Sequence, residues 1–117
     1  MRYLLMNCSN VNRDQTMSDA ERSAEWNAYL QYTQEAIAAG VMKGGEGLMP
    51  PSTATTVRIR DGKALTTDGP FAETKEQLAG FYILEVDNLD QAIQWAAKIP
   101  AALYGAVEIR PVIDING

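Results

Sequence analysis

Three segments of this chain are rich in apolar residues, and their pattern along the chain predicts β-strands. In residues 2–8, both alternating sets are largely apolar, namely Tyr3, Leu5 and Asn7 against Leu4, Met6 and Cys8. Residues 79–86 are also apolar on both sides. Such runs are typical of strands that are covered on both faces. A last strand is predicted over residues 105–113, where Pro111 suits a sheet edge or a strand end.

Helical spacing of apolar residues predicts two helices between these strands. Ser18 and Glu21 form a capping box, which opens the first helix, and Gly40 ends it. Its apolar stripe consists of Trp26, Tyr29, Leu30, Thr33 and Ile37. The second helix begins after Asp87 or Asn88 and ends before Pro100. Its stripe consists of Leu89, Ala92, Ile93, Ala96 and Ala97.

A β-hairpin is predicted in the middle of the chain. Residues 54–60 alternate and are rich in β-branched side chains, and Asp61-Gly62 is a strong hairpin turn signal. The return strand covers residues 63–67, and residues 72–78 could form a helical turn.

Two further segments are polar or glycine-rich. Residues 9–17 are predicted to form a loop, and residues 44–51 an exposed connector because they hold three glycines and Pro50-Pro51. The glycine spacing matches neither nucleotide-binding fingerprint, so phosphate binding is disfavoured.

Together these elements predict one α+β domain over residues 1–117. Leaving out one strand of the hairpin gives βαββαβ, the ferredoxin-like plan with two helices on one face of an antiparallel sheet. The strands are apolar on both sides, so the other face would be bare. Because an uncovered apolar face usually marks a partner surface, we expect a homodimer through the sheet faces.

Composition narrows the function classes. The net charge of −5 disfavours binding to nucleic acid or to an anionic membrane, and no apolar run is long enough to span a bilayer. The single cysteine, Cys8, cannot form an internal disulfide, which favours a cytoplasmic location. The chain has no histidine, so acid–base chemistry must use carboxylates, Tyr, Lys or Cys8. We expect no cofactor and no metal.

Residues 68–76 combine a turn, an aromatic residue and charges. Asp68-Gly69-Pro70 is a turn signal, and Phe71, Glu73, Lys75 and Glu76 follow it. A loop that buries Phe71 beside carboxylates would suit a binding site, and it would equally suit a structural corner.

This segment also carries a family resemblance. Together with Thr55-Thr56-Val57-Arg58, Gly80-Phe81-Tyr82 and residues 105–112, it resembles the DGPF-domain branch of the YCII-related proteins. The resemblance implies a dimeric α+β barrel, in a superfamily that includes lactone isomerases and lyases of aromatic degradation. It also implies a possible regulatory role, because some relatives accompany extracytoplasmic-function sigma factors.

The chain departs from the pattern of YCII proteins in one respect. Those proteins are thought to use a histidine on the first helix with an aspartate before the proline that follows the second helix. This chain lacks histidine, and Ile99 precedes Pro100. That chemistry therefore does not carry over.

Five residues remain candidates for a site. Asp68 could act as an acid or base, or simply accept N–H bonds within its turn. Arg58 could bind an anionic substrate, or pair across strands if Glu108 lies close to it. Glu73 could help bind a substrate or lie on a solvated turn beside Glu76. The remaining two substrate-binding candidates are Phe71 and Tyr82, the second of which could also be a core residue.

Two functions follow from these residues. The first is a cofactor-free lyase or isomerase that acts on a small anionic organic molecule, with Asp68 as acid or base. The second is a non-catalytic module that senses a ligand or meets a sigma factor. A dimeric scaffold without either activity is the third alternative.

Overall fold

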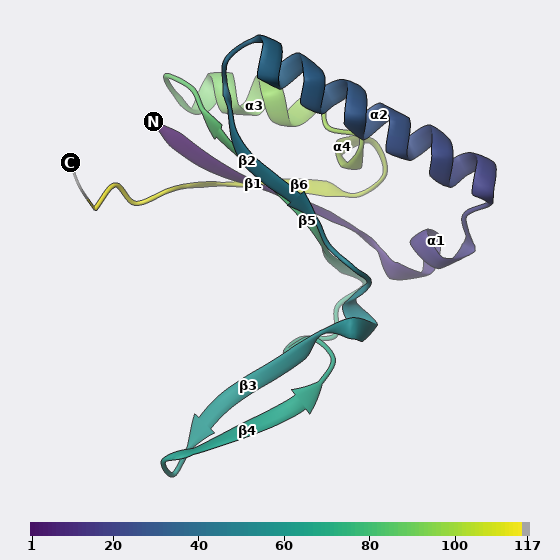
Figure 1. Cartoon of the computed structure of the whole chain (residues 1–117), viewed down its shortest axis with the longest axis vertical. Helices are drawn as coiled ribbons and strands as arrows, with labels where there is room; N and C mark the ends of the chain where they lie inside the picture. The colour runs from purple at the N-terminus through teal and green to yellow at the C-terminus, as the bar shows by residue number, and fades with distance from the viewer. Residues whose placement is uncertain (116–117) are drawn as a thin grey trace.

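The computed structural model describes residues 1–115, which form a four-stranded antiparallel sheet, a separate two-stranded hairpin and helices on one sheet face (Figure 1). The strands are β1 (Arg2–Asn10), β2 (Met42–Gly47), β3 (Thr55–Arg60), β4 (Lys63–Asp68), β5 (Glu76–Glu85) and β6 (Ala106–Pro111). The helices are α1 (Val11–Thr16), α2 (Asp19–Ala38), η1 (Pro51–Thr53), α3 (Leu89–Ala97) and α4 (Ala101–Tyr104). None of the described helices is both long and apolar enough to cross a membrane.

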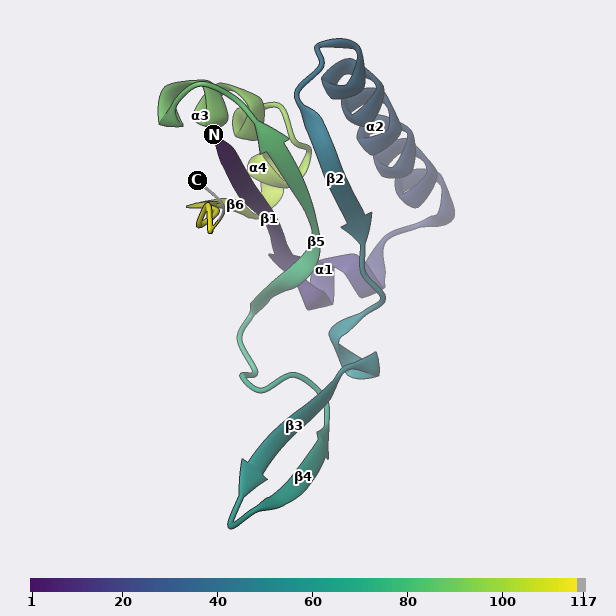
Figure 2. The ribbon, with the colours of Figure 1, turned by 60° about the vertical axis from the view of Figure 1, so that its left-hand side comes forward.

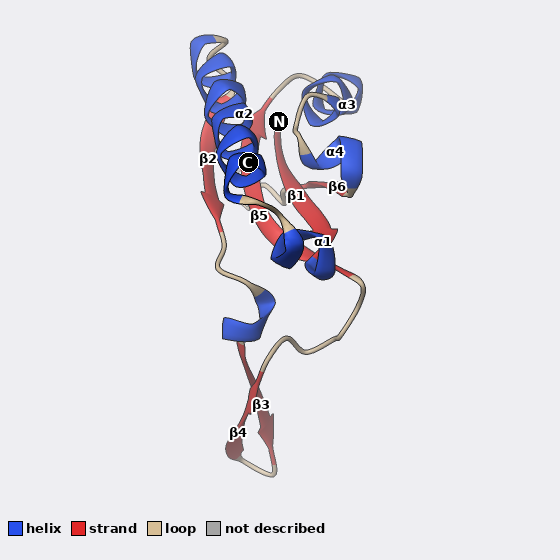
Figure 3. Ribbon diagram, turned by 90° about the vertical axis from the view of Figure 1, so that its right-hand side faces the viewer, coloured by secondary structure: helices blue, strands red, loops and turns tan. Residues whose placement is uncertain are grey.

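The main sheet has the strand order β2-β5-β1-β6, with each neighbouring pair antiparallel. Together with α2 and α3, this order gives the ferredoxin-like βαββαβ plan. Both helices cover the same sheet face (Figure 3). The predicted fold class is therefore confirmed.

The strand that completes this plan differs from the predicted one. The sequence pattern predicts that one strand of the central hairpin belongs to the βαββαβ plan and that residues 44–51 form a connector. In the structure, residues 42–47 form the edge strand β2, which pairs with β5. The prediction was wrong because three of the six residues of β2 are glycines, and alternation is a pattern of side chains.

The β3–β4 hairpin is an insertion between β2 and β5. Its turn at Asp61-Gly62 is confirmed, with both residues at positive φ. The two strands pair only with each other and extend away from the main sheet (Figure 2). No helical turn follows them, because β5 already begins at Glu76.

The core lies between the sheet and its helices. The alternation of β1 turns Tyr3 and Leu5 toward the helices, where β5 adds Tyr82 and Leu84. The helices and the segment after α3 contribute Tyr32, Ala36, Ala92, Ala96 and Ile99. The α3 stripe is thus confirmed at its two buried alanines.

The stripe of α2 is offset from the predicted one. Tyr32 and Ala36 are buried, whereas Trp26, Leu30 and Ile37 are exposed. Trp26 and Leu30 instead line a cavity that separates the first half of α2 from the sheet. A cavity at this place explains why apolar residues at helical spacing do not enter the core.

The opposite sheet face is uncovered. The other alternating set of β1, Leu4, Met6 and Cys8, is only half-buried there, as are Phe81 and Ile83 of β5. Burial, with smaller contributions from the carboxylates of Glu108 and Glu76, raises the pKa of the Cys8 thiol. This bare apolar face is what the sequence analysis expected.

The capping box of α2 offers a test of local stability. The Ser18 hydroxyl accepts from the Glu21 N–H at 3.1 Å, and the Glu21 carboxylate accepts from the Ser18 N–H at 3.1 Å. We expect Ser18→Ala to lower the free energy of unfolding by about 1 kcal/mol, measured by urea denaturation. The same change at Ser23, which is exposed inside α2, should raise it by up to about 0.5 kcal/mol. Equal effects at both positions would contradict the role of the cap.

Candidate functional site

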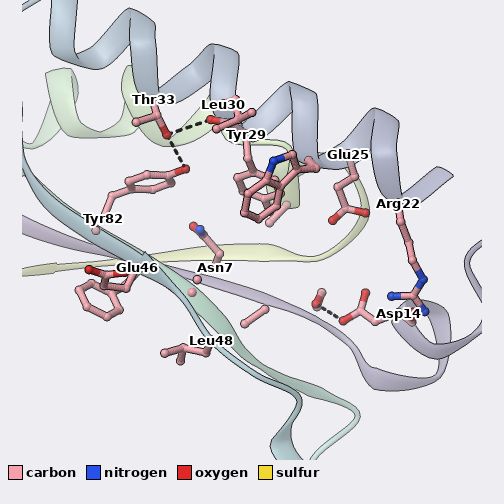
Figure 4. Close-up of a pocket in the computed structure, with 18 of the residues that line it drawn as sticks. Asn7, Asp14, Arg22, Glu25, Tyr29, Leu30, Thr33, Glu46, Leu48 and Tyr82 are labelled. Atoms are coloured by element: carbon pink, nitrogen blue, oxygen red, sulfur yellow. Dashed lines mark hydrogen bonds between the residues drawn. The ribbon is translucent and has the colours of Figure 1, made fainter. Parts of the chain in front are cut away.

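A cavity of about 670 Å³ lies between the first half of α2 and the sheet. Its floor is formed by β1, β2 and β5, and its roof by the stripe of α2 that the core does not use (Figure 4). The lining combines aromatic and polar side chains: Asn7, Ser9, Asp14, Arg22, Glu25, Trp26, Tyr29, Leu30, Thr33, Glu46, Leu48, Tyr82 and Tyr104. This mixture is typical of ligand pockets.

Glycines make room for the cavity. Along β2, Gly45 pairs with Tyr82 and Gly47 pairs with Gly80, and these positions face α2 with Asn7. A Cβ at position 45 would stand 2.7 Å from the Tyr82 ring, whereas one at position 47 would meet nothing within 4 Å. The glycine-rich run is therefore a strand that forms the floor of a pocket.

A cluster of charges closes one end of the cavity. The Arg13 guanidinium lies 3.0 Å from the Asp14 carboxylate and 3.3 Å from the Glu25 carboxylate. It also stacks on the Tyr104 ring, 3.4 Å from the centroid. Burial lowers the pKa of Arg13, but Glu25, Tyr104 and Asp14 together outweigh it, and the pKa is raised. Both carboxylates therefore share one cation.

The two acidic residues also hold hydroxyl groups. Ser9 Oγ donates to Asp14 at 2.6 Å. The Tyr104 hydroxyl donates to Glu25 and lies 3.2 Å from the Tyr29 hydroxyl. Since the Tyr104 hydroxyl donates its proton to the bond with Glu25, Tyr29 must be the donor to Tyr104. Burial, and then the bond to Glu25, raises the pKa of Tyr104. The result is a chain from Tyr29 through Tyr104 to a carboxylate.

The other end of the cavity holds a second hydroxyl pair. Thr33 Oγ1 donates to the Tyr29 carbonyl at 2.9 Å and lies 3.2 Å from the Tyr82 hydroxyl. Because the Thr33 proton is engaged, the Tyr82 hydroxyl donates to Thr33. Burial raises the pKa of Tyr82. With 9% of its surface exposed, Tyr82 is also part of the core.

Of the five candidates from the sequence, Tyr82 alone lines this cavity. Asp68 ends β4 on the hairpin, and Arg58 lies on β3; both are exposed. Glu73 is exposed in the segment that follows. Phe71 is 79% exposed, so the expectation that its loop buries it was wrong for the single chain. The structure does not bring these four residues to the cavity.

The expected pairing between Arg58 and Glu108 was also wrong. The two residues lie in different sheets, and Glu108 pairs with Arg110 on its own strand at 2.7 Å. Among residues 1–115, no three His, Cys, Asp or Glu side chains gather in a way that could hold a metal ion.

Several residues in or beside the cavity were not predicted from the sequence. Arg13 and Asp14 lie on α1, which was predicted as a loop because six residues are too few for a helical period. The available signal was Asn10, whose side chain caps α1 by accepting from the N–H groups of Asn12 and Arg13. A second signal was Asn7, a polar residue on the buried side of an apolar strand.

Comparison with known proteins places the chain in a family. The sequence profile of the YCII-related domain matches residues 1–116, so the chain belongs to the YCII-related family. An uncharacterized protein of Rhizobium meliloti (strain 1021) is 40% identical over 78 residues, which cover 65% of this chain. The matched region spans 63% of that relative's length.

A solved structure shares the fold. It is the 5-chloro-2-hydroxyhydroquinone dehydrochlorinase of Burkholderia phenoliruptrix AC1100 in complex with 2,5-dihydroxybenzoquinone. The two structures align with a TM-score of 0.56 over 97% of this chain and 94% of that one, at 16% identity. The likeness supports a fold of the dimeric α+β barrel type.

The hydroxyl chain at Tyr104 can be tested by stability. We expect Tyr104→Phe to lower the free energy of unfolding by about 1–3 kcal/mol, because Glu25 loses a donor and Tyr29 an acceptor, while the ring under Arg13 remains. Tyr3→Phe is the matched control, since that hydroxyl contacts only the Met1 sulfur at 3.5 Å. It should change stability much less. Equal losses in urea denaturation would argue against the chain.

Proposed function

We propose that the chain binds a small organic molecule in the cavity under α2. The observation that carries this proposal is the cavity itself, where aromatic walls surround polar groups that converge from α1, α2 and β1. The family and the fold agree with it, since the structural neighbour of similar fold was solved with a small ring compound.

We further propose a cofactor-free lyase or isomerase reaction, which needs only a proton acceptor and a proton donor. Glu25 is the best-placed acceptor, because its carboxylate lines the cavity at the end of the Tyr29–Tyr104 chain. The two hydroxyl groups can return a proton to another atom of the substrate. The neighbour's dehydrochlorinase activity is an elimination on a ring compound and supports this class of reaction.

The expectation that Asp68 is the acid or base and that Arg58 binds an anionic substrate stays a prediction. In the single chain both residues lie on the hairpin, outside the cavity. They could reach a substrate only at a different site or in an assembly.

A ligand-sensing module without catalysis is the second candidate. The observation in its favour is that Arg13 already pairs with both carboxylates at the end of the cavity. A carboxylate held by a cation is a weaker base, so the same pocket could bind without turning its ligand over.

A binding and turnover screen with cyclic lactones and hydroxylated ring compounds tests these proposals. We expect Gly47→Leu to abolish binding. The space beside position 47 is open, so the leucine side chain would project into the cavity and fill it. Glu25→Gln should retain binding and lower turnover at least about a hundredfold. Glu35→Gln, on the same helix but paired with Lys98 outside the cavity, is the control.

Each alternative has its own outcome in that screen. Binding without turnover by the wild type would favour the sensing module. Loss of turnover in Asp68→Asn, with full turnover in Glu25→Gln, would move the acid–base group to the hairpin. Unchanged binding in Gly47→Leu would rule out the cavity.

We also propose a homodimer through the uncovered sheet face. Leu4, Met6 and Ile83 form the middle of that face, and they lie on the two central strands of the sheet. Burial of such a face against a second copy removes apolar surface from water. The cavity lies on the opposite side of the sheet and would stay open.

Light scattering after size exclusion tests the dimer. We expect a dimer at micromolar concentration for the wild type and a monomer for Met6→Glu, because a charge would be buried at the centre of the interface. Leu103→Glu, at a position that is 88% exposed on α4, is the matched control and should stay dimeric. A monomeric wild type would contradict the proposal.

A further inference from the structure

The Asn7 side chain is a buried amide without a hydrogen-bond partner. Only 5% of its surface is exposed, and its Oδ1 atom is buried and unpaired. Within the described residues the structure gives its Nδ2 no partner either. A buried polar group of this kind destabilises a fold, so its presence needs an explanation. Ser9, two residues along the same face, is equally buried but donates to Asp14.

The amide faces the cavity. The alternation of β1 turns Asn7 toward α2. Its neighbours across the sheet are Gly80 and, one strand further, Gly47 on one side, and Val107 on the other. Neither glycine has a side chain that could cover the amide. Figure 4 shows Asn7 rising from the floor between Tyr82 and Glu25. The Oδ1 atom is enclosed in the free protein, so a ligand in the cavity reaches both amide atoms after a rotation about the last side-chain torsion of Asn7, which is a soft one.

The charged side chains at the cavity balance one another, so the hydrogen-bonding groups decide which ligand fits. The carboxylates of Asp14 and Glu25 line it, and Arg13, beside the cavity, is already paired with both; Glu46 pairs with Phe81 and points to the other face of the sheet. Arg22 is the remaining cation that lines the cavity among the described residues, and its Nη2 donates to the Asp14 carbonyl at 2.7 Å. A carboxylate ligand offers acceptors only and would leave the Asn7 Oδ1 without a donor, whereas a neutral group with a donor beside an acceptor satisfies both amide atoms.

Building on the pocket function proposed above, we propose that Asn7 recognises an uncharged planar ring ligand that carries a hydrogen-bond acceptor beside a donor. The amide presents one donor group and one acceptor, so such a ligand forms two parallel hydrogen bonds with it. The ring lies against the aromatic side chains of the lining. Asn7 is thus a binding residue that is left unsatisfied until the ligand arrives.

Benzamide and benzoate form a matched pair of probes. They have nearly the same shape, but benzamide is neutral with a donor beside an acceptor, whereas benzoate is anionic with acceptors only. Titration of isotope-labelled protein, followed by amide chemical shifts, measures both affinities. We expect the wild type to bind benzamide about tenfold more tightly than benzoate.

The variant Asn7→Leu should lose this preference, because the side chain keeps its size but offers no hydrogen bond. Without ligand it should unfold at a higher urea concentration than the wild type, since it removes an unpaired buried amide. Ser9→Ala is the control for stability, and it should unfold at a lower concentration because Asp14 loses its donor. Stabilisation together with lost binding identifies a ligand group rather than a structural one.

The outcomes separate this assignment from the pocket function. Equal affinity for both probes, or an unchanged preference in Asn7→Leu, overturns the role of Asn7 while the pocket stands. Destabilisation by Asn7→Leu overturns it too, because the amide would then have a structural partner. Failure of both probes to shift any cavity residue, with no binding in the wider ligand screen, overturns both proposals.

Discussion

The structure depends on the pairing of β1, one of the two strands of the main sheet that have neighbours on both sides. Because β5 and β6 fix its register, its alternating side chains are divided between two environments. Tyr3 and Leu5 enter the core under the helices, and Asn7 and Ser9 continue the same face into the cavity. The other set forms the uncovered face. A slip of one residue would exchange these faces, so the register sets the core, the pocket and the uncovered face together.

The cavity results from missing side chains as much as from those present. The glycines of β2 lower the floor, and the shifted burial of α2 leaves Trp26 and Leu30 as walls. The polar groups at the far end are mutually satisfied through Arg13, whereas Asn7 is not. Such a site combines a rigid, stabilising cluster with one destabilising group, a division that is expected where function competes with stability.

Sequence patterns predicted the long elements and missed the short or bare ones. The capping box at Ser18, the hairpin turn at Asp61 and the buried strands carry strong local signals, and all three are present. Helix α1 is too short for periodicity, and the glycines of β2 hide its alternation. Both failures fell on the elements that build the cavity. The sequence patterns therefore predicted the fold but not the residues that form the cavity.

The motif at residues 68–76 shows a different limit. A turn with nearby charges indicates local chemistry, but its position depends on how the hairpin is placed in three dimensions. Four of the five candidate residues lie on that hairpin or the segment after it, while Tyr82 alone lies at the cavity. The cavity is assembled from residues that are distant in sequence, such as Glu25 and Tyr104. No local motif encodes such a meeting.

The position of Cys8 has a practical consequence. It is the only cysteine of the chain, and it lies on the uncovered sheet face, where burial and two carboxylates keep it in the unreactive thiol form. Because alkylating reagents attack the thiolate, its labelling is slow and sensitive to any further covering of that face. The labelling rate of Cys8 would therefore report whether a second copy covers this face.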